Sequence, residues 1–169
     1  MARLDLRTEL DRQVRESRRM GADVLLGGDP VNTLEGRGAF YAPTILTQVT
    51  VDMPVFREET FGPVAPVIRA RDAEHAVELA NDSQFGLGGN IWTQDIEKAR
   101  ETAARIESGN VFINGMTASD PRLPFGGVKR SGYGRELSQF GIREFVNVQT
   151  VWIGPADPGA AAKTAPATE

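Results

Sequence analysis

The chain has 169 residues, enough for one domain with a buried core, and its 40% hydrophobic and 25% charged residues are typical of a globular protein. Its net charge of −4 disfavours nucleic acid and anionic membranes as partners, since both bind a basic face. The lack of cysteine excludes disulfides, thiolate metal sites and a thiol nucleophile, and we predict no metal site. Residues 1–20 mix both charge signs without the apolar core of a signal peptide, so we expect a cytoplasmic protein.

The first part of the chain predicts one helix and several extended segments. Apolar residues recur every four positions over residues 4–19, which indicates an amphipathic helix. Gly21 follows its last turn and suits a left-handed cap. We expect a strand over residues 23–26 and an extended segment over residues 40–46.

The middle of the chain alternates strands with helices, and Asp72 and Asp95 are placed to cap the two helices. Such alternation with short links is typical of right-handed parallel crossovers. The predicted fold class is therefore α/β with a parallel βαβαβ core. Its predicted strands cover residues 64–69, 89–93 and 110–114, and its predicted helices cover residues 73–80 and 96–107.

The last part of the chain is less regular. Residues 115–134 form a loop, and loops of this length inside compact domains are usually functional. A short helix over residues 135–140 and a final strand over residues 145–153 follow. The Ala-, Pro- and Gly-rich tail, residues 154–169, has little to bury and is expected to be disordered.

Two segments have residue types suited to binding chemistry. In the EETFGPV segment, residues 58–64, a carboxylate outside a strand can accept hydrogen bonds from ribose hydroxyls, although a solvated turn is the alternative. The glycines of residues 120–136 lack the spacing of a phosphate-binding loop or dinucleotide motif, and the alternative is a solvent loop with tight turns. His75 lies within a predicted helix, where we expect a structural role.

Several segments taken together resemble the aldehyde dehydrogenase superfamily. The resemblance covers residues 4–153 in the family's order and at about its spacing, and it is greatest to the succinate-semialdehyde dehydrogenase branch. It implies that residues 1–153 are the C-terminal part of the catalytic domain. The segments are GADVLLGGD, GAFYAPTIL, EETFGPV, LANDSQFGLGGNIWTQD, SGNVFIN, LPFGGVKRSGYGREL and GIREFVNVQTVW.

The resemblance implies oxidation of an aldehyde to an acid with NAD or NADP as cofactor. In the family, a cysteine thiolate attacks the aldehyde, hydride passes to nicotinamide, and a glutamate activates the water that hydrolyses the thioester. The cysteine, this glutamate, the oxyanion-hole asparagine and the dinucleotide-binding domain lie upstream of the matched region. We therefore assign no catalytic residue and expect the chain alone to be inactive.

Some family roles do carry over to cofactor binding. Glu59 matches the glutamate that holds the nicotinamide ribose, and Phe61 matches the aromatic residue that helps to place the nicotinamide ring. The residues that distinguish NAD from NADP lie upstream, so the preference stays open. A free-standing nucleotide-binding domain is a disfavoured alternative, since the phosphate-binding part is upstream as well.

The resemblance also assigns a substrate entrance. The loop from Asn114 to Phe125 matches the segment that lines the entrance for a small aldehyde. Within it, Ser119 and Arg122 are candidates to bind the distal carboxylate of a semialdehyde, because guanidinium pairs well with carboxylate. The alternative is that Arg122 is an ordinary surface arginine.

The family role of residues 145–153 is oligomerisation by pairing with a neighbouring subunit's sheet edge. We therefore expect a homo-oligomer or an association with the missing N-terminal part. A non-catalytic module that assembles with full-length subunits is the alternative function. We also expect exposed apolar surface and marginal stability in the isolated chain.

Overall fold

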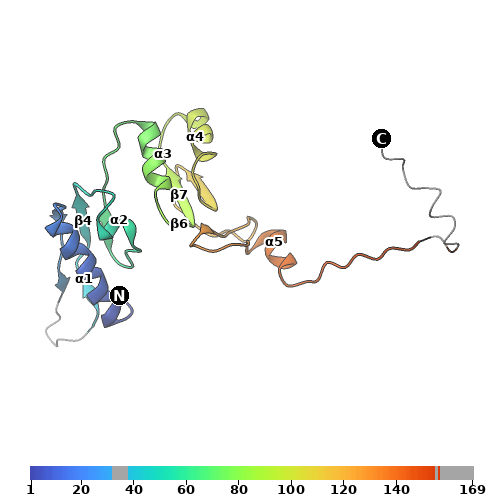
Figure 1. The fold of residues 1–169 in the computed structure, drawn as a ribbon, viewed down its shortest axis with the longest axis horizontal. Helices are drawn as coiled ribbons and strands as arrows, with labels where there is room; N and C mark the ends of the chain where they lie inside the picture. The colour runs from blue at the N-terminus through green and yellow to red at the C-terminus, as the bar shows by residue number, and fades with distance from the viewer. Residues whose placement is uncertain (32–37, 155, 157–169) are drawn as a thin grey trace.

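Short strands and helices alternate along the computed structural model, which describes residues 1–31, 38–154 and 156 (Figure 1). The elements in chain order are α1 (Leu4–Arg19), β1 (Asp23–Leu26), β2 (Pro30–Val31), β3 (Phe40–Tyr41), β4 (Thr44–Thr47), α2 (Pro54–Arg57), β5 (Val64–Pro66), α3 (Ala73–Asn81), β6 (Phe85–Gly86), β7 (Gly88–Ile91), α4 (Ile96–Ala103), β8 (Asn110–Ile113), β9 (Val128–Lys129) and α5 (Ser138–Arg143).

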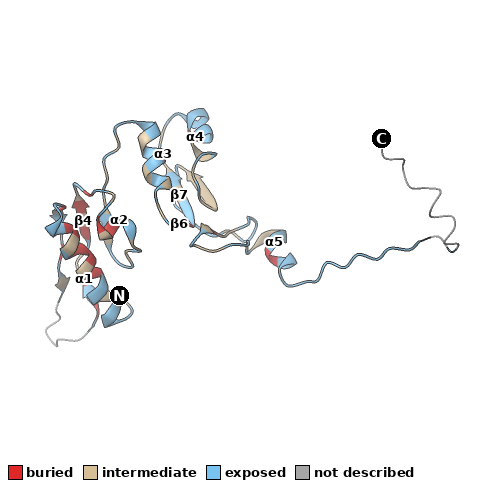
Figure 2. Cartoon of the chain, viewed as in Figure 1, coloured by how far each residue is buried: buried red, intermediate tan, exposed pale blue. Residues whose placement is uncertain are grey.

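The first region, which we call the N-terminal lobe, comprises residues 1–31 and 38–68. Helix α1 covers a sheet of order β1-β4-β5, in which β1 and β4 are antiparallel and β4 and β5 are parallel. Leu10 and Val14 of α1 pack with Leu46 of β4 and with Met53 beside α2. Figure 2 shows this buried layer between α1, β4 and α2. The predicted helix and the left-handed Gly21 are both confirmed.

The second region, which we call the α3–α4 lobe, comprises residues 69–114. Strands β7 and β8 pair in parallel across α4, with Gly88 opposite Asn110. Both predicted caps are confirmed: Asp72 accepts from the backbone N–H of His75 at 2.8 Å, and Asp95 accepts from that of Lys98 at 3.0 Å. The β7–α4–β8 unit is therefore the predicted parallel crossover.

The α/β class is confirmed, but the predicted βαβαβ core is divided between two sheets. Strand β5 pairs with β4, whereas β7 and β8 form a separate pair. The apolar pattern locates strands but does not identify their partners, so it could not show that β5 joins a different sheet from β7 and β8. The predicted strand over residues 64–69 also ends early, at Pro66, which has no N–H to donate.

The predicted helix boundaries also need correction. The second helix stops at Ala103 rather than at residue 107, and the last helix, α5, spans Ser138–Arg143 rather than residues 135–140. Between Phe125 and Glu136, two backbone hydrogen bonds form a bridge that keeps Glu136 in extended backbone, so the helix begins later. End positions depend on such tertiary contacts as well as on local sequence.

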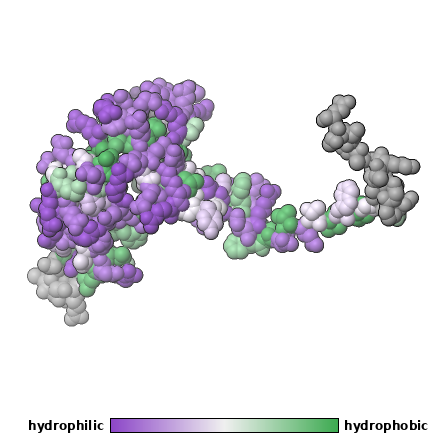
Figure 3. All heavy atoms as spheres, viewed as in Figure 1, coloured by the Kyte–Doolittle hydropathy of each residue, from purple (hydrophilic) through white to green (hydrophobic). Residues whose placement is uncertain are grey.

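Residues 144–154, which we call the C-terminal arm, leave the rest of the chain after α5 (Figure 1). Within the described residues, 145–153 do not form the predicted strand, because an extended segment needs a second strand to bond with. Phe145 is 92% exposed and Trp152 is 85% exposed. Figure 3 shows hydrophobic atoms along this arm, so the expected exposed apolar surface is confirmed. The predicted disorder of residues 154–169 falls almost wholly outside the described residues.

Candidate functional site

The segment that carries Glu59 is fixed between α1 and the end of α2. The backbone N–H of Glu58 donates to the carbonyl oxygen of Pro54 at 2.9 Å, which closes the last turn of α2. The Glu59 carbonyl oxygen accepts from Nε2 of Gln13 on α1 at 3.1 Å. The backbone of Glu59 is thus held by a buried side chain of a different element.

The Glu59 side chain itself is exposed and lies on the wall of a cavity of about 380 Å³. The rest of its lining comes from the end of α3, from β6 and β7 and from the segment before β8, and includes Leu87 and Ser131. Within residues 1–31, 38–154 and 156, no donor bonds the Glu59 carboxylate. Phe61, with 63% exposure, does not line this cavity. Of the two residues predicted to hold the cofactor, only Glu59 therefore lines this cavity.

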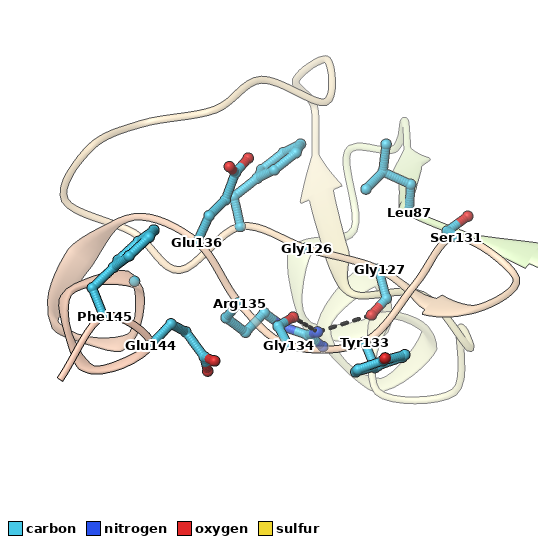
Figure 4. A pocket seen from close by; sticks show the side chains of 12 residues that line it. Leu87, Gly126, Gly127, Ser131, Tyr133, Gly134, Arg135, Glu136, Glu144 and Phe145 are labelled. Atoms are coloured by element: carbon cyan, nitrogen blue, oxygen red, sulfur yellow. Dashed lines mark hydrogen bonds between the residues drawn. The ribbon is translucent and has the colours of Figure 1, made fainter. Parts of the chain in front are cut away.

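A second cavity of about 410 Å³ lies under the long loop (Figure 4). Phe125, Tyr133 and Glu136 line it, together with Leu87 and Ser131. Since Leu87 and Ser131 line both cavities, the Glu59 cavity and the Phe125 cavity adjoin. The structure thus brings the predicted cofactor residue Glu59 and the predicted entrance residue Phe125 to neighbouring hollows.

The glycines of the loop serve close backbone packing as well as turns. A Cβ atom on Gly109, the residue before β8, would lie 1.8 Å from the carbonyl oxygen of Gly126. By contrast, Gly132 meets the predicted turn requirement, since its φ is +112° and no atom lies near its absent side chain. The loop therefore runs directly over the backbone at the start of β8.

Sequence reasoning missed two side chains that hold this loop. Asn110 donates from Nδ2 to the carbonyl oxygens of Leu87 and Gly126, at 3.0 and 2.9 Å. Lys129 donates from Nζ to the carbonyl oxygen of Asn81 at 2.7 Å and pairs with the Glu107 carboxylate at 2.8 Å. An asparagine at the first position of a strand and a lysine within a glycine-rich loop were the available indications.

Asn114 lies at the end of β8 in left-handed backbone, with φ of 53°. Its side chain accepts from the Thr93 N–H at 2.9 Å and donates to the Thr93 carbonyl oxygen at 2.8 Å. The amide therefore ties the ends of β7 and β8 together. Asn114 supports the start of the entrance loop, and its polar atoms are already paired.

Arg122 is paired within its own loop. It donates to the Asp120 carboxylate from Nε at 2.9 Å and from Nη2 at 2.6 Å. The hydrogen bonds from the Arg122 side chain and backbone lower the pKa of Asp120. Ser119 is exposed beside this pair. A substrate carboxylate that binds Arg122 therefore competes with a partner from the same loop.

The remaining polar residues do not form a second site in the described chain. The His75 ring accepts from the Arg71 N–H through Nδ1 at 3.2 Å, in keeping with its predicted structural role. Among residues 1–31, 38–154 and 156, no three His, Asp or Glu side chains are grouped to hold a metal ion. In the same residues, no helix has the length and hydropathy that a membrane span requires.

Comparison with known proteins identifies the family. The model of the aldehyde dehydrogenase family matches residues 1–151. The chain belongs to the aldehyde dehydrogenase family. It is 59% identical over 152 residues to succinate semialdehyde dehydrogenase, NAD(P)+, of Escherichia coli strain K12, covering 90% of this chain and 32% of that protein. Succinate-semialdehyde dehydrogenase, NADP(+), 1 of Mycobacterium ulcerans strain Agy99 is 54% identical over 148 residues, covering 88% and 32%.

Solved structures of aldehyde dehydrogenases share the fold. Succinic semialdehyde dehydrogenase from Streptococcus pyogenes, in complex with NADP+, aligns with a TM-score of 0.85 and 39% identity. The match covers 92% of this chain and 33% of that one. The chain therefore spans about a third of the length of the aldehyde dehydrogenases that it matches.

Proposed function

We propose that this chain forms the C-terminal part of an NAD(P)-dependent aldehyde dehydrogenase that oxidises a short semialdehyde, such as succinic semialdehyde, to the acid. The observation that carries the proposal is the exposed Glu59 carboxylate on a cavity that adjoins the Phe125 loop. The names of the relatives from E. coli and M. ulcerans support the substrate class.

The Glu59 side chain suits a nicotinamide cofactor chemically. Ribose hydroxyls donate hydrogen bonds, and the Glu59 carboxylate is an acceptor that no donor in residues 1–31, 38–154 and 156 occupies. We propose that Glu59 binds the ribose and that Phe61, largely exposed nearby in the sequence, packs against the nicotinamide. When bound, the cofactor accepts the hydride from the aldehyde.

This chain contributes a cofactor-binding group and an entrance, and no nucleophile. It contains no cysteine, and His75 is already engaged with the backbone of Arg71. We therefore propose that the thiol and the hydrolytic base belong to other segments of a longer protein or assembly, and that the chain alone is inactive.

The entrance loop is the proposed specificity element. We propose that Arg122 and Ser119 bind the distal carboxylate of the semialdehyde, with Arg122 exchanging Asp120 for the substrate. The Arg122→Ala variant should then raise KM for succinic semialdehyde more than KM for a neutral aldehyde. An equal change for both aldehydes would show that Arg122 is an ordinary surface residue.

A chimera tests the proposed function. This chain would be joined to the two thirds of the E. coli relative that it does not match, and NAD(P)H formation from succinic semialdehyde would be followed. We expect the chimera to be active and the isolated chain to be inactive. Glu59→Gln should raise KM for the cofactor, since the amide is a weaker acceptor than the carboxylate. An unchanged cofactor KM in this variant would refute the role of Glu59.

The C-terminal arm favours a second candidate function, that of a module that assembles with intact subunits. Its apolar side chains, including Phe145 and Trp152, are exposed and available to a neighbouring sheet edge. Co-expression with the intact E. coli relative should then yield a mixed oligomer with no gain in turnover. Failure to co-purify would remove this candidate.

A further inference from the structure

We propose that Gln13 is a positioning residue for Glu59 and thereby sets the affinity of the assembled enzyme for its nicotinamide cofactor. The inference rests on the proposed function of Glu59. Gln13 is a polar side chain with only 3% exposure, in the middle of α1 and on its core-facing side. It is distant from Glu59 in sequence, and it contacts that residue directly.

The carboxamide of Gln13 uses both of its N–H groups on the Glu58–Glu59 segment. Nε2 donates to the carbonyl oxygen of Glu59 at 3.1 Å and to Oε2 of Glu58 at 3.1 Å. Both partners are acceptors, so the nitrogen end of the amide must face them. The other end, Oε1, is buried with no partner in the described residues. A buried acceptor left unpaired is unfavourable, and the two donated bonds offset this penalty.

A second α1 residue, Arg12, donates to the same Oε2 atom of Glu58. Arg12 pairs with Glu58 and is itself held by Glu9 and by Glu16, the latter at 2.6 Å. The hydrogen bonds that Arg12 donates, first to Glu9 and then to Glu58, raise the pKa of Arg12. Glu58 is therefore the anchored glutamate of the pair, with its side chain fixed against α1.

The anchoring of Glu58 directs Glu59. Glu58 has extended backbone, with φ of −106° and ψ of 161°, and successive side chains of extended backbone point to opposite sides. With Glu58 fixed toward α1, the Glu59 carboxylate points toward the cavity that it lines. Gln13 and Arg12 thus hold the Glu58 side chain against α1, and the Glu59 side chain is left to bind the cofactor.

A neighbouring contact supplies a matched control. Ser17 lies one turn after Gln13, is fully buried, and accepts a hydrogen bond from the Val55 N–H at 3.3 Å. Ser17 therefore joins α1 to the body of α2 without contacting the Glu58–Glu59 segment. Loss of the Ser17 hydroxyl should lower stability and leave the cofactor site in place.

The test compares variants in the active chimera. Gln13→Met keeps the side-chain volume and removes both donated bonds, whereas Ser17→Ala removes the control contact. KM for NAD(P), KM for succinic semialdehyde and Tm would be measured for each. We expect Gln13→Met to raise the cofactor KM about fivefold, which is the effect of losing the net free energy of about one hydrogen bond. The aldehyde KM should stay within about twofold, and Ser17→Ala should lower Tm alone.

Arg12→Met keeps the proposal testable if Gln13→Met fails to fold, since Arg12 is partly exposed and we expect its replacement to leave the fold intact. It should raise the cofactor KM to a smaller extent. An unchanged cofactor KM in the folded Gln13 and Arg12 variants would overturn the inference. If Glu59→Gln still raised the cofactor KM in that case, the proposed function would stand without it. An unchanged cofactor KM in Glu59→Gln would instead refute the proposed role of Glu59, on which this inference rests.

Discussion

The N-terminal lobe and the rest of the chain differ in how they are stabilised. Nine of the eleven buried hydrophobic residues of the described chain lie in the N-terminal lobe, and only Val77 and Ala99 lie beyond it. The lobe buries Leu10, Val14 and Leu46 almost completely between α1 and its sheet. It therefore has a core of its own, whereas the later elements mostly share backbone contacts and polar bonds.

The α3–α4 lobe has a hollow where a core would lie. A cavity of about 400 Å³ between α3, β7 and α4 is lined by apolar side chains such as Val77, Ile91, Ala99 and Ile106. Because proteins rarely leave such apolar surface open, we expect other segments of the proposed longer protein to cover it. From this contrast we propose that the N-terminal lobe folds on its own and that the α3–α4 lobe needs further segments to complete it.

The largest expected loss of stability comes from a substitution in the core of the N-terminal lobe. Leu10→Ala should lower the free energy of unfolding by about 3 kcal/mol, because Leu10 is 1% exposed and its removal leaves a cavity. Leu4→Ala, on the same helix at 56% exposure, is the control and should cost less than about 1 kcal/mol. Urea unfolding of the isolated chain measures both, and equal losses would contradict a separate core.

Close backbone packing in the rest of the chain provides the next test. Gly109→Ala would place a Cβ atom 1.8 Å from a carbonyl oxygen, so the loop must shift at a cost of about 2 kcal/mol. Gly115→Ala is the control, since its nearest neighbour would lie at 3.9 Å, an ordinary contact. The Tm of the chimera checks this, and it should fall only for Gly109→Ala.

Tyr41 makes the N-terminal lobe sensitive to alkaline pH. Burial, followed by the nearby Asp11 carboxylate, raises the pKa of Tyr41, and its hydroxyl donates to the Gly28 carbonyl oxygen at 3.1 Å. An unfolded tyrosine loses its proton near pH 10, so stability is present below about pH 10 and declines above it. The decline is at most about 1.4 kcal/mol per pH unit.

The Tyr41→Phe variant isolates this contribution. Urea unfolding at about pH 9 and about pH 11 would be compared for the two proteins. The advantage of the wild-type chain should shrink or reverse at the higher pH, since phenylalanine has no proton to lose. A constant difference across this range would show that Tyr41 does not couple stability to pH.

The smallest expected effect concerns the α3–α4 lobe. Asp95→Ala should cost about 1 kcal/mol in the chimera, because it removes the cap that accepts from the Lys98 N–H. Asp95→Asn retains the acceptor and is the control. In the isolated chain, Asp95→Ala should leave the global unfolding transition almost unchanged if this lobe lacks independent stability. A loss of about 1 kcal/mol in the isolated chain would contradict the proposed difference between the two lobes.

Local rules predicted the elements that are determined by nearby residues. Helix α1 matches its predicted range, and the caps at Asp72 and Asp95 bond as expected, because periodicity and capping act within a few residues. Pairing of β5 with β4 was not predictable, since it depends on distant segments. The strand predicted over residues 145–153 has no partner in the described chain, and this is why it is not formed.

In the candidate site too, some residues were predictable from the sequence and others depend on contacts with distant segments. The resemblance to the family indicated Glu59 and the loop from Asn114 to Phe125 by their position in ordered motifs. Gln13 and Asn110 were missed because a lone amide has no diagnostic pattern, and its role depends on which backbone it meets. The pairing of Arg122 with Asp120 was also missed, although the two lie only two residues apart.

Amide hydrogen exchange tests the central claim most directly, that this chain is a part whose second region and site are completed by other segments. Exchange would be compared between the isolated chain and the active chimera. We predict that α1 and β4 are protected in both, whereas β7, α4 and β8 are protected only in the chimera. Equal protection of β7 and β8 in the isolated chain would contradict the account.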